Sequence, residues 1–279
     1  MFPKWAAFPL GISAIMQPAS GWALDLEYSS HLSLYYPQIG VSEPSGLAID
    51  ATGTGFWIVS DESDTVFRLE ANGGLWAFTG GDRRLRDLEG ITVDMANERL
   101  LLVSEQTASI IEIPLSPPHQ VSSVQIQGMR SSVDLGNALT ERDNGLEGVT
   151  VDPASGAVFV LKEAEPRLLV EIAPTLDRII SVRNLDEVLP EDEDVSGLAV
   201  DPRRSGLWIV SDRGKSVHFL PHDASAVASF DLVWRKGNRL RQLDNAEGVA
   251  ISPDGRSLFV VTDDDRHSLL VQYNILDGD

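Results

Sequence analysis

A glycine that opens a short apolar segment recurs five times along this chain, at Gly46, Gly90, Gly148, Gly197 and Gly248. A second apolar segment follows each glycine and ends fourteen residues after it with a polar residue, and the fifteenth residue is always acidic. These acidic residues are Asp61, Glu105, Glu163, Asp212 and Asp263. A repeat of about 50 residues that holds two strands in fixed positions is typical of a radial β array. The sequence therefore predicts an all-β fold built of repeated units.

The two segments of each repeat have the patterns of neighbouring strands. The first alternates bulky and small side chains, as in Gly90–Val93, which predicts one packed face and one face against close neighbours. The second is apolar throughout, as in Leu100–Val103, which predicts a strand covered on both faces. Turn residues and further alternating segments supply about two more strands in each repeat. We therefore expect a β-propeller with four antiparallel strands in each blade.

The number of repeats predicts five blades. A sixth, degenerate blade is an alternative, and so is a pair of β-sandwiches, although sandwich strands do not recur in phase every 50 residues or so. The segment His31–Tyr36 alternates and precedes the first repeat. We expect it to complete the last blade, so that strands from both ends of the chain close the ring.

The first 23 residues have the layout of a secretory signal peptide. One basic residue, Lys4, precedes an apolar stretch from Trp5 to Met16, and Pro18 and small residues follow up to Ala23. We expect cleavage near Ala23, and a retained inner-membrane anchor through residues 5–23 is the alternative. Residues 24–279 then form a single propeller domain. An export signal in a chain without cysteine suits the bacterial envelope, so we expect a periplasmic or secreted protein.

The chain is strongly acidic, with 42 Asp and Glu against 22 Lys and Arg and a formal net charge of −20. The negative electrostatic potential of such a chain disfavours binding to nucleic acid and to anionic membrane surfaces. No segment after the N-terminal stretch approaches the length of a membrane span, so we expect no membrane insertion once the signal peptide is removed. We expect a monomer whose partner is a small molecule or an envelope protein.

Carboxylates in phase with the repeat indicate one mouth of the propeller channel as the site. Glutamates directly precede three of the five glycines, whereas Ser45 and Ser196 take this place in the first and fourth repeats. The loop before the first strand of a blade and the loop after the second lie on the same face, so both sets of acids should converge. The predicted metal ligands are Glu89, Glu147, Glu247, Glu105 and Glu163. Further predicted rim residues are Glu43, Asp61, Lys162, Asp194, Asp212 and Asp263.

An acidic rim of this kind requires a counter-charge. Two carboxylates about 6 Å apart repel each other by roughly 3 kcal/mol at an effective dielectric constant of about 20. Calcium fits such a site, because it binds about six to eight oxygens in irregular geometry and requires neither His nor Cys. The five histidines occupy no position of the repeat. We therefore predict calcium as the cofactor, and hydrogen bonds from nearby backbone to the in-phase acids are the alternative.

Four segments of the chain resemble the SdiA-regulated, YjiK-like proteins of bacteria: NGLEGVTVD (residues 144–152), VFVLKEAEP (158–166), DVSGLAV (194–200) and NAEGVAIS (245–252). The resemblance spans residues 40–275 or so, and its most specific part is the K-E-x-x-P element at Lys162, Glu163 and Pro166. It implies a five-bladed propeller with a bound calcium ion and an envelope location, and it implies no particular biochemical activity. The chain is more distantly similar to NHL-repeat propellers, to calcium-dependent gluconolactonase-type hydrolases and to phytase-like esterase domains.

Two functions are compatible with these patterns. In the first, a calcium-binding propeller serves as a binding or scaffold module of the envelope. In the second, the chain is a metal-dependent hydrolase (an esterase, a lactonase or a phytase-like phosphoesterase) in which Glu147 is the candidate base. The sequence contains no phosphate-binding loop, nucleophile elbow, zinc-binding HExxH helix or dinucleotide fingerprint. Any catalysis would therefore depend on the metal and the carboxylates.

Overall fold

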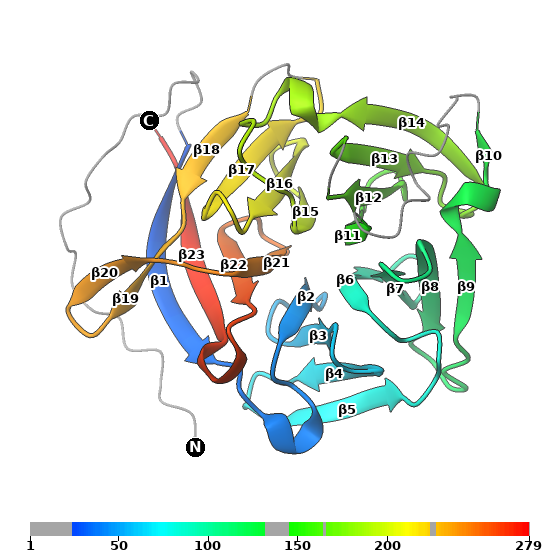
Figure 1. Ribbon diagram of the computed structural model, residues 1–279, viewed down its shortest axis with the longest axis horizontal. Helices are drawn as coiled ribbons and strands as arrows, with labels where there is room; N and C mark the ends of the chain where they lie inside the picture. The colour runs from blue at the N-terminus through cyan, green and yellow to red at the C-terminus, as the bar shows by residue number, and fades with distance from the viewer. Residues whose placement is uncertain (1–23, 132–144, 164–165, 224–226, 279) are drawn as a thin grey trace.

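The chain folds into a five-bladed β-propeller, as the repeat predicts (Figure 1). The computed structural model describes residues 24–131, 145–163, 166–223 and 227–278. In these residues five sheets stand around a central axis, and each blade contains four antiparallel strands from its inner to its outer edge. The predicted all-β class and the predicted number of blades are both confirmed.

Strands that follow one another in the chain form the first four blades. Blade 1 contains β2 (Pro44–Ile49), β3 (Phe56–Ser60), β4 (Thr65–Leu69) and β5 (Leu75–Gly80). Blade 2 contains β6 (Leu88–Asp94), β7 (Arg99–Ser104), β8 (Ser109–Pro114) and β9 (Ser122–Gln125). Blade 3 contains β11 (Leu146–Val151), β12 (Val158–Lys162), β13 (Leu168–Ile172) and β14 (Arg178–Asn184). Blade 4 contains β15 (Gly197–Asp201), β16 (Gly206–Ser211), β17 (Ser216–Pro221) and β18 (Ala228–Asp231).

Blade 5 joins the two ends of the described chain. Its strands are β21 (Ala246–Ile251), β22 (Ser257–Thr262), β23 (Leu269–Asp277) and β1 (Leu24–Ser33). β1 pairs with β23 from Leu24 opposite Asp277 to Ser33 opposite Leu269. A strand from the N-terminal region therefore closes the ring, as predicted, but it begins before His31 and ends at Ser33. Tyr36, the predicted end of this strand, pairs with Val41 instead.

A few short elements lie outside this pattern. β10 (Arg130–Ser131) runs parallel to β14, and β19 (Val233–Lys236) and β20 (Arg239–Gln242) form a separate two-stranded hairpin. The 3₁₀ helices are η1 (Pro37–Ile39), η2 (Ile126–Gly128), η3 (Leu185–Glu187) and η4 (Asp265–His267). The predicted signal peptide, residues 1–23, lies outside the described residues. Within the described part of the chain, no helix has the length and apolar character of a membrane span.

The repeat glycines lie where the inner strands of neighbouring blades meet. A Cβ atom on Gly46 would lie 3.0 Å from the Cα of Gly90, and one on Gly90 would lie 3.0 Å from the Cα of Gly148. The same contact joins Gly148 to Gly197 and Gly197 to Gly248, at 3.2 Å in both cases. A Cβ on Gly248 would lie 2.8 Å from the backbone of blade 1, which completes the circle. A side chain at any of these positions would push two blades apart, so close packing at the axis explains why the residue is glycine each time.

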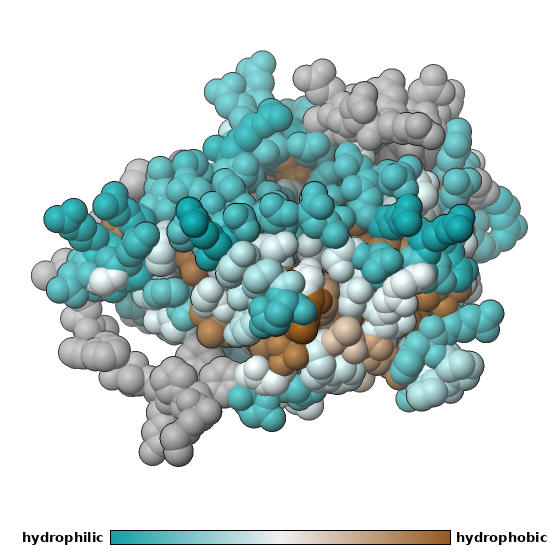
Figure 2. Space-filling model, turned by 60° about the horizontal axis from the view of Figure 1, so that its bottom comes forward, coloured by the Kyte–Doolittle hydropathy of each residue, from teal (hydrophilic) through white to brown (hydrophobic). Residues whose placement is uncertain are grey.

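The second strand of each blade is covered on both faces. In β7, Leu100 and Leu102 pack with Val59 of blade 1, whereas Leu101 and Val103 pack toward blade 3. Alternating side chains of one strand therefore fill both inter-blade spaces, which is why these segments are apolar throughout. On the face shown in Figure 2, hydrophilic side chains cover most of the surface and apolar groups form only small separate patches.

Candidate functional site

The three repeat glutamates lie at β-bulges of the inner strands. In blade 2, Leu88 pairs with Ser104 and Gly90 with Val103, so that Glu89 is the extra residue between them. The register shifts in the same way around Glu147 in β11 and around Glu247 in β21. A bulge leaves one residue out of the ladder and changes the direction of its side chain. The irregular register at the start of these three strands therefore sets the glutamates apart from the regular alternation of the blade.

Backbone hydrogen bonds bring the fifteenth-place acids to the same face as these glutamates. The N–H group of Glu105 donates to the carbonyl oxygen of Asp87 at 3.0 Å, just before β6 begins. Glu163 donates to Gly145 at 3.1 Å and Asp263 to Asn245 at 2.8 Å in the same manner. The loop that leads into the inner strand and the loop that leaves the second strand are thus joined at one channel mouth. This is the convergence that the repeat predicts.

Three carboxylates of blade 2 form the tightest acidic cluster in the described residues. One oxygen from each of Asp87, Glu89 and Glu105 lies within 4.8 Å of the others. Glu105 also accepts a hydrogen bond from the backbone N–H of Gly145 at 3.1 Å, which ties it to the start of blade 3. Glu89 and Glu105 belong to the ligand set predicted from sequence, whereas Asp87 does not. The sequence feature that could have identified Asp87 is its position three residues before Gly90. Glu43 and Asp194 lie at the same position in their repeats.

The inner glutamates resist ionisation because they are buried among like charges. Burial raises the pKa of Glu89 to about 8, and repulsion from Asp61, Asp87 and Glu105 acts in the same direction. Burial and the charge of Glu89 raise the pKa of Glu147 well above its ordinary value.

Glu247 shows the same effect on the other side of the mouth. Burial raises its pKa, and repulsion from Asp212 and from Glu89 adds to the shift. No side-chain hydrogen bond or ion pair within the described residues neutralises the carboxylates of Glu89, Glu147 and Glu247. The inner part of the mouth is therefore a set of partly exposed acids that form no ion pair within the described residues.

The outer rim surrounds these glutamates with further acids. Burial and repulsion from Asp61 and Glu43 raise the pKa of Asp263 to about 6. Burial also raises the pKa values of Asp61, Glu43 and Asp212, and each of these carboxyls has at least one acidic neighbour. The structure thus brings the predicted rim acids of blades 1, 4 and 5 into one electrostatically coupled group.

Lys162 of blade 3 and Arg213 of blade 4 supply positive charge at the rim. Lys162 is almost fully buried, with 2% of its surface exposed. The charges of Lys162 and Arg213 oppose the effects of burial and of Asp194 on Glu163, whose pKa is nevertheless raised. The lysine that replaces the serine or threonine of the other repeats therefore lies beside the acids, where it offsets part of their repulsion.

One predicted rim residue, Asp194, and the two serines that precede repeat glycines have structural partners. Asp194 accepts hydrogen bonds from Ser211 Oγ at 2.6 Å and from the backbone N–H of Arg213 at 3.1 Å, so its oxygens stabilise a loop of blade 4. The serines that stand in place of the glutamates also bind backbone. Ser45 Oγ donates to the carbonyl of Leu88, and Ser196 Oγ donates to that of Ala246 at 2.8 Å. In blades 1 and 4 this position therefore links one blade to the next.

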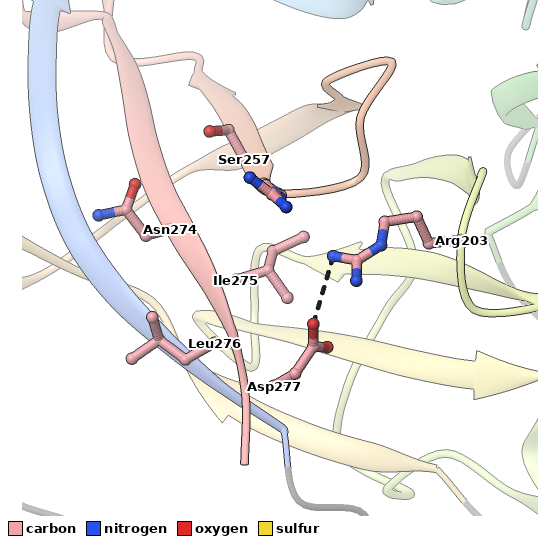
Figure 3. A pocket seen from close by; sticks show the side chains of 7 residues that line it. Arg203, Ser257, Asn274, Ile275, Leu276 and Asp277 are labelled. Carbon is pink, nitrogen blue, oxygen red and sulfur yellow. Dashed lines mark ion pairs between the residues drawn. The ribbon is translucent and has the colours of Figure 1, made fainter. Parts of the chain in front are cut away.

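A hollow of about 340 Å³ lies away from the acidic mouth, between the turns that follow β15 and β21 and the strand β23 (Figure 3). Its lining includes Arg203, Arg256, Ser257 and Asp277. Arg203 Nη1 lies 3.2 Å from Asp277 Oδ2, so one of its two arginines is already paired. None of the acidic mouth residues lines this hollow. The candidate site is therefore the acidic mouth, whose chemistry is that of an oxygen-only cation site.

Solved structures that resemble the chain are propellers of diverse function. Glutaminyl cyclase of Myxococcus xanthus has a TM-score of 0.57 and 12% identity, over 92% of this chain and 100% of that one. A gluconolactonase of Xanthomonas campestris has a TM-score of 0.54 and 12% identity, over 87% and 89%. Virginiamycin B lyase of Staphylococcus aureus has a TM-score of 0.51 and 9% identity, over 91% and 100%. At these identities the likeness shows the fold alone.

Sequence families give a more specific assignment. No curated protein matches the chain. A family model described as SdiA-regulated matches residues 26–267, which includes all five repeat glycines and every acid of the channel mouth. The family that the motifs of the sequence indicated is thus confirmed, and this chain belongs to the SdiA-regulated family of β-propellers.

Proposed function

We propose that this chain is an exported propeller that binds calcium at its acidic channel mouth and serves as a binding module of the bacterial envelope. The observation that carries the proposal is the cluster of Asp87, Glu89 and Glu105, whose oxygens lie within 4.8 Å of one another. These carboxylates are only partly exposed, so they repel one another, and bound protons or a cation would relieve the repulsion at neutral pH.

The donor set fits calcium better than the other common metals. All three side chains offer oxygen, and two backbone-anchored loops carry them, so the ligands can adapt to an irregular coordination shell. Zinc and copper sites use histidine or cysteine, and neither residue type is in the cluster. Magnesium requires near-octahedral geometry and retains most of its water, which suits a site with one or two carboxylates. In the proposed site Asp87, Glu89 and Glu105 hold the ion, and Glu147 and Glu247 add to the negative potential around it.

A calcium titration tests the proposal. Protein treated with a chelator should bind calcium in calorimetry, and saturation at 100 times the dissociation constant should add about 2.7 kcal/mol to the free energy of unfolding. The variant Asp87→Asn should bind calcium at least about tenfold more weakly, because it removes one charged ligand. Glu187→Gln is a matched control, because Glu187 is an exposed residue of η3 that is not part of the mouth. If neither calcium nor chelator changes the melting temperature of the wild-type protein, the proposed metal site is wrong.

A metal-dependent hydrolase is the second candidate function, and the position of Glu147 favours it. This glutamate lies outside the three-carboxylate cluster, yet it is close enough for Glu89 and Glu105 to raise its pKa. A general base works best when its pKa lies near the working pH, and a raised pKa moves a carboxylate in that direction. Since a gluconolactonase shares the fold, lactones are the first substrates to assay, followed by simple esters and phosphate esters. Calcium-dependent turnover that is lost in Glu147→Gln, with calcium affinity retained, would identify an enzyme rather than a binding module.

The proposed envelope location rests on the sequence of residues 1–23 and has its own test. Cleavage near Ala23 would leave Leu24 as the first residue of β1, and the pairing of β1 with β23 would be complete. Mass spectrometry of the protein from a periplasmic fraction should therefore find an N-terminus near Leu24. An intact N-terminus in the membrane fraction would instead support the retained anchor.

A further inference from the structure

The hairpin β19–β20 is a basic segment in an acidic protein. Residues 233–242 include Arg235, Lys236, Arg239 and Arg241 but no acidic residue, although the chain has 42 acidic and only 22 basic side chains. In the described residues, no ion pair involves any of these four side chains. The hairpin therefore presents four cations that the rest of the described chain does not neutralise.

The base of the hairpin packs on the propeller, and a Cβ atom on Gly237 in its turn would meet no described residue within 4 Å apart from its chain neighbours. The ring of Trp234 packs edge-on against His31 of β1, with 5.1 Å between the ring centres, and it also contacts the core beneath blades 4 and 5. From there the two strands run outward across the edge of the disc, beside β1 (Figure 1). Four residues per strand at about 3.4 Å each give the hairpin a length of roughly 13 Å. The cations next to the turn therefore lie at the outer end of the hairpin, whereas Arg235 lies near enough to Tyr28 of β1 to oppose the rise in pKa that burial causes there.

Within the described residues β20 pairs only with β19, and the hairpin register gives the direction of the backbone groups on its other edge. Lys236 pairs with Arg239 across a two-residue turn in which Gly237 has a φ of 60°. Hydrogen-bonded and non-hydrogen-bonded pairs alternate along such a hairpin, beginning with the bonded pair next to the turn. The N–H of Leu243 donates to the carbonyl of Leu232 at 2.9 Å, as this alternation requires. The N–H and C=O groups of Leu240 and Gln242 must therefore point away from β19.

The side chains of β20 would present two different faces to an added strand. All four residues of β20 are exposed, and Leu240 exposes 59% of its surface. Arg239 and Arg241 share one face of the strand, and Leu240 and Gln242 share the other. An extended segment that alternates acidic and apolar residues would match both faces while it pairs with the open backbone edge.

We propose that β20 is a docking edge for an acidic, extended segment of another polypeptide, which adds to the hairpin as a third strand. Larger polyanions fit less well. A membrane surface or a DNA duplex that reached the hairpin would also approach the acidic disc, which carries the whole excess of negative charge. A single extended segment contacts the hairpin alone.

Protection of the open edge from aggregation is the simpler explanation for charges in this strand. That role requires charges of either sign, and an acidic chain could supply it with Glu or Asp. The hairpin uses four cations and no acid, which is the charge that attracts an acidic partner.

A synthetic peptide tests the proposal without calcium, so its outcome is independent of the metal site. The probe is a nine-residue peptide of alternating Glu and Val with blocked ends, added to the full chain in the presence of a chelator. The double variant R239Q/R241Q should bind it about tenfold more weakly than wild type, because two partly screened ion pairs are lost. The control R178Q/R256Q makes the same change of charge at two exposed arginines that form no ion pair with any other described residue, and it should bind as wild type does. On binding, hydrogen exchange at the Leu240 and Gln242 amides should slow by about tenfold or more.

Four results would overturn the proposal. The first is that wild type and R239Q/R241Q bind the peptide with equal affinity, and the second is that the peptide binds without protecting the Leu240 and Gln242 amides. The third is that the protein binds DNA or vesicles with anionic lipid but does not bind the peptide. The fourth is that the protein self-associates and the double variant abolishes this self-association. The third result would assign the hairpin to a larger polyanion, and the fourth would assign it to a second copy of the chain. Circular dichroism and the melting temperature of each variant establish that the fold is retained.

Discussion

Glutamine in place of Glu89 should stabilise the metal-free protein at neutral pH and flatten the dependence of its stability on pH. Glu89 lies at the centre of the acidic mouth, where burial and the charges of Asp61, Asp87 and Glu105 raise its pKa to about 8. The unfolded chain lacks this environment, so the carboxyl returns to its ordinary pKa of 4.5 on unfolding. Between these two values the folded protein binds one more proton at this position than the unfolded chain does.

The magnitude follows from proton linkage. A group that is protonated only in the folded state lowers the free energy of unfolding by about 1.4 kcal/mol for each unit of increasing pH. Glu89 alone should therefore remove about 3 kcal/mol between pH 5 and pH 7.5. Glu147 and Glu247 act in the same direction because their pKa values are also raised, and the charge of Glu89 contributes to both shifts. A neutral glutamine removes the loss of stability that Glu89 itself causes, and it lessens the rise in the pKa values of Glu147 and Glu247.

Urea denaturation at pH 5 and at pH 7.5 in the presence of a chelator measures the effect. Wild type and the control Glu187→Gln should lose about 3 kcal/mol or more over this range, and Glu89→Gln should lose clearly less. Calcium should restore the stability of wild type at pH 7.5 and have a smaller effect on Glu89→Gln. The electrostatic reasoning is refuted if metal-free wild type is as stable at pH 7.5 as at pH 5, or if Glu89→Gln shows the same decline.

Three further predictions concern the ring itself. Gly90→Ala should destabilise the fold by about 2 kcal/mol or more in urea denaturation, because the new Cβ would lie 2.9 Å from the carbonyl oxygen of Glu147. Ser196→Ala should cost about 1–3 kcal/mol by the same measurement, because the carbonyl of Ala246 loses a buried donor 2.8 Å away. Deletion of Leu24–Ser33 should open blade 5 and expose the edge of β23, with loss of the cooperative thermal transition and aggregation in light scattering. A truncated chain that melts cooperatively near the wild-type temperature would contradict the ring closure.

Most of the fold could be predicted because the constraint that determines it recurs in the sequence. Neighbouring inner strands approach so closely at Gly90 and Gly148 that no side chain fits, and the same contact repeats around the axis. A glycine at a fixed distance before an apolar strand therefore directly indicates the close approach of inner strands in a propeller.

The bounds of β1 and the existence of the β19–β20 hairpin could not be predicted in this way. The register of β1 is set by β23, which is far away in the sequence, and a bulge between Tyr28 and Ser30 interrupts its alternation. The hairpin adds no length to its repeat, since Gly197 and Gly248 have an ordinary spacing and the outer strand β18 is only four residues long.

The candidate site was harder to predict than the fold because residues in the same phase have different partners. Asp87 and Asp194 both lie three places before a repeat glycine. Asp87 joins the carboxylate cluster, whereas Asp194 accepts hydrogen bonds from Ser211 and Arg213. Ser104 of blade 2 has the same phase as Ser211, yet its hydroxyl contacts Thr107 rather than Asp87. Repeat phase gives the residue type at each position but not the partner that its side chain takes.

The glycine and the residue before it form one structural unit, and this unit explains why the acidic mouth is uneven. The glycine permits two inner strands to meet, and the register shift beside it leaves the preceding residue next to the joint between blades. Where that residue is serine, as at Ser45 and Ser196, its hydroxyl donates to the backbone of the next blade and the joint is satisfied. A glutamate cannot donate when it is ionised, so it leaves a partly exposed charge at the same position. Three of the five contacts between inner strands therefore require a proton or a cation, whereas the other two contain their own hydrogen bond. The requirement is strongest in blade 2, where Asp87 and Glu105 lie close to Glu89.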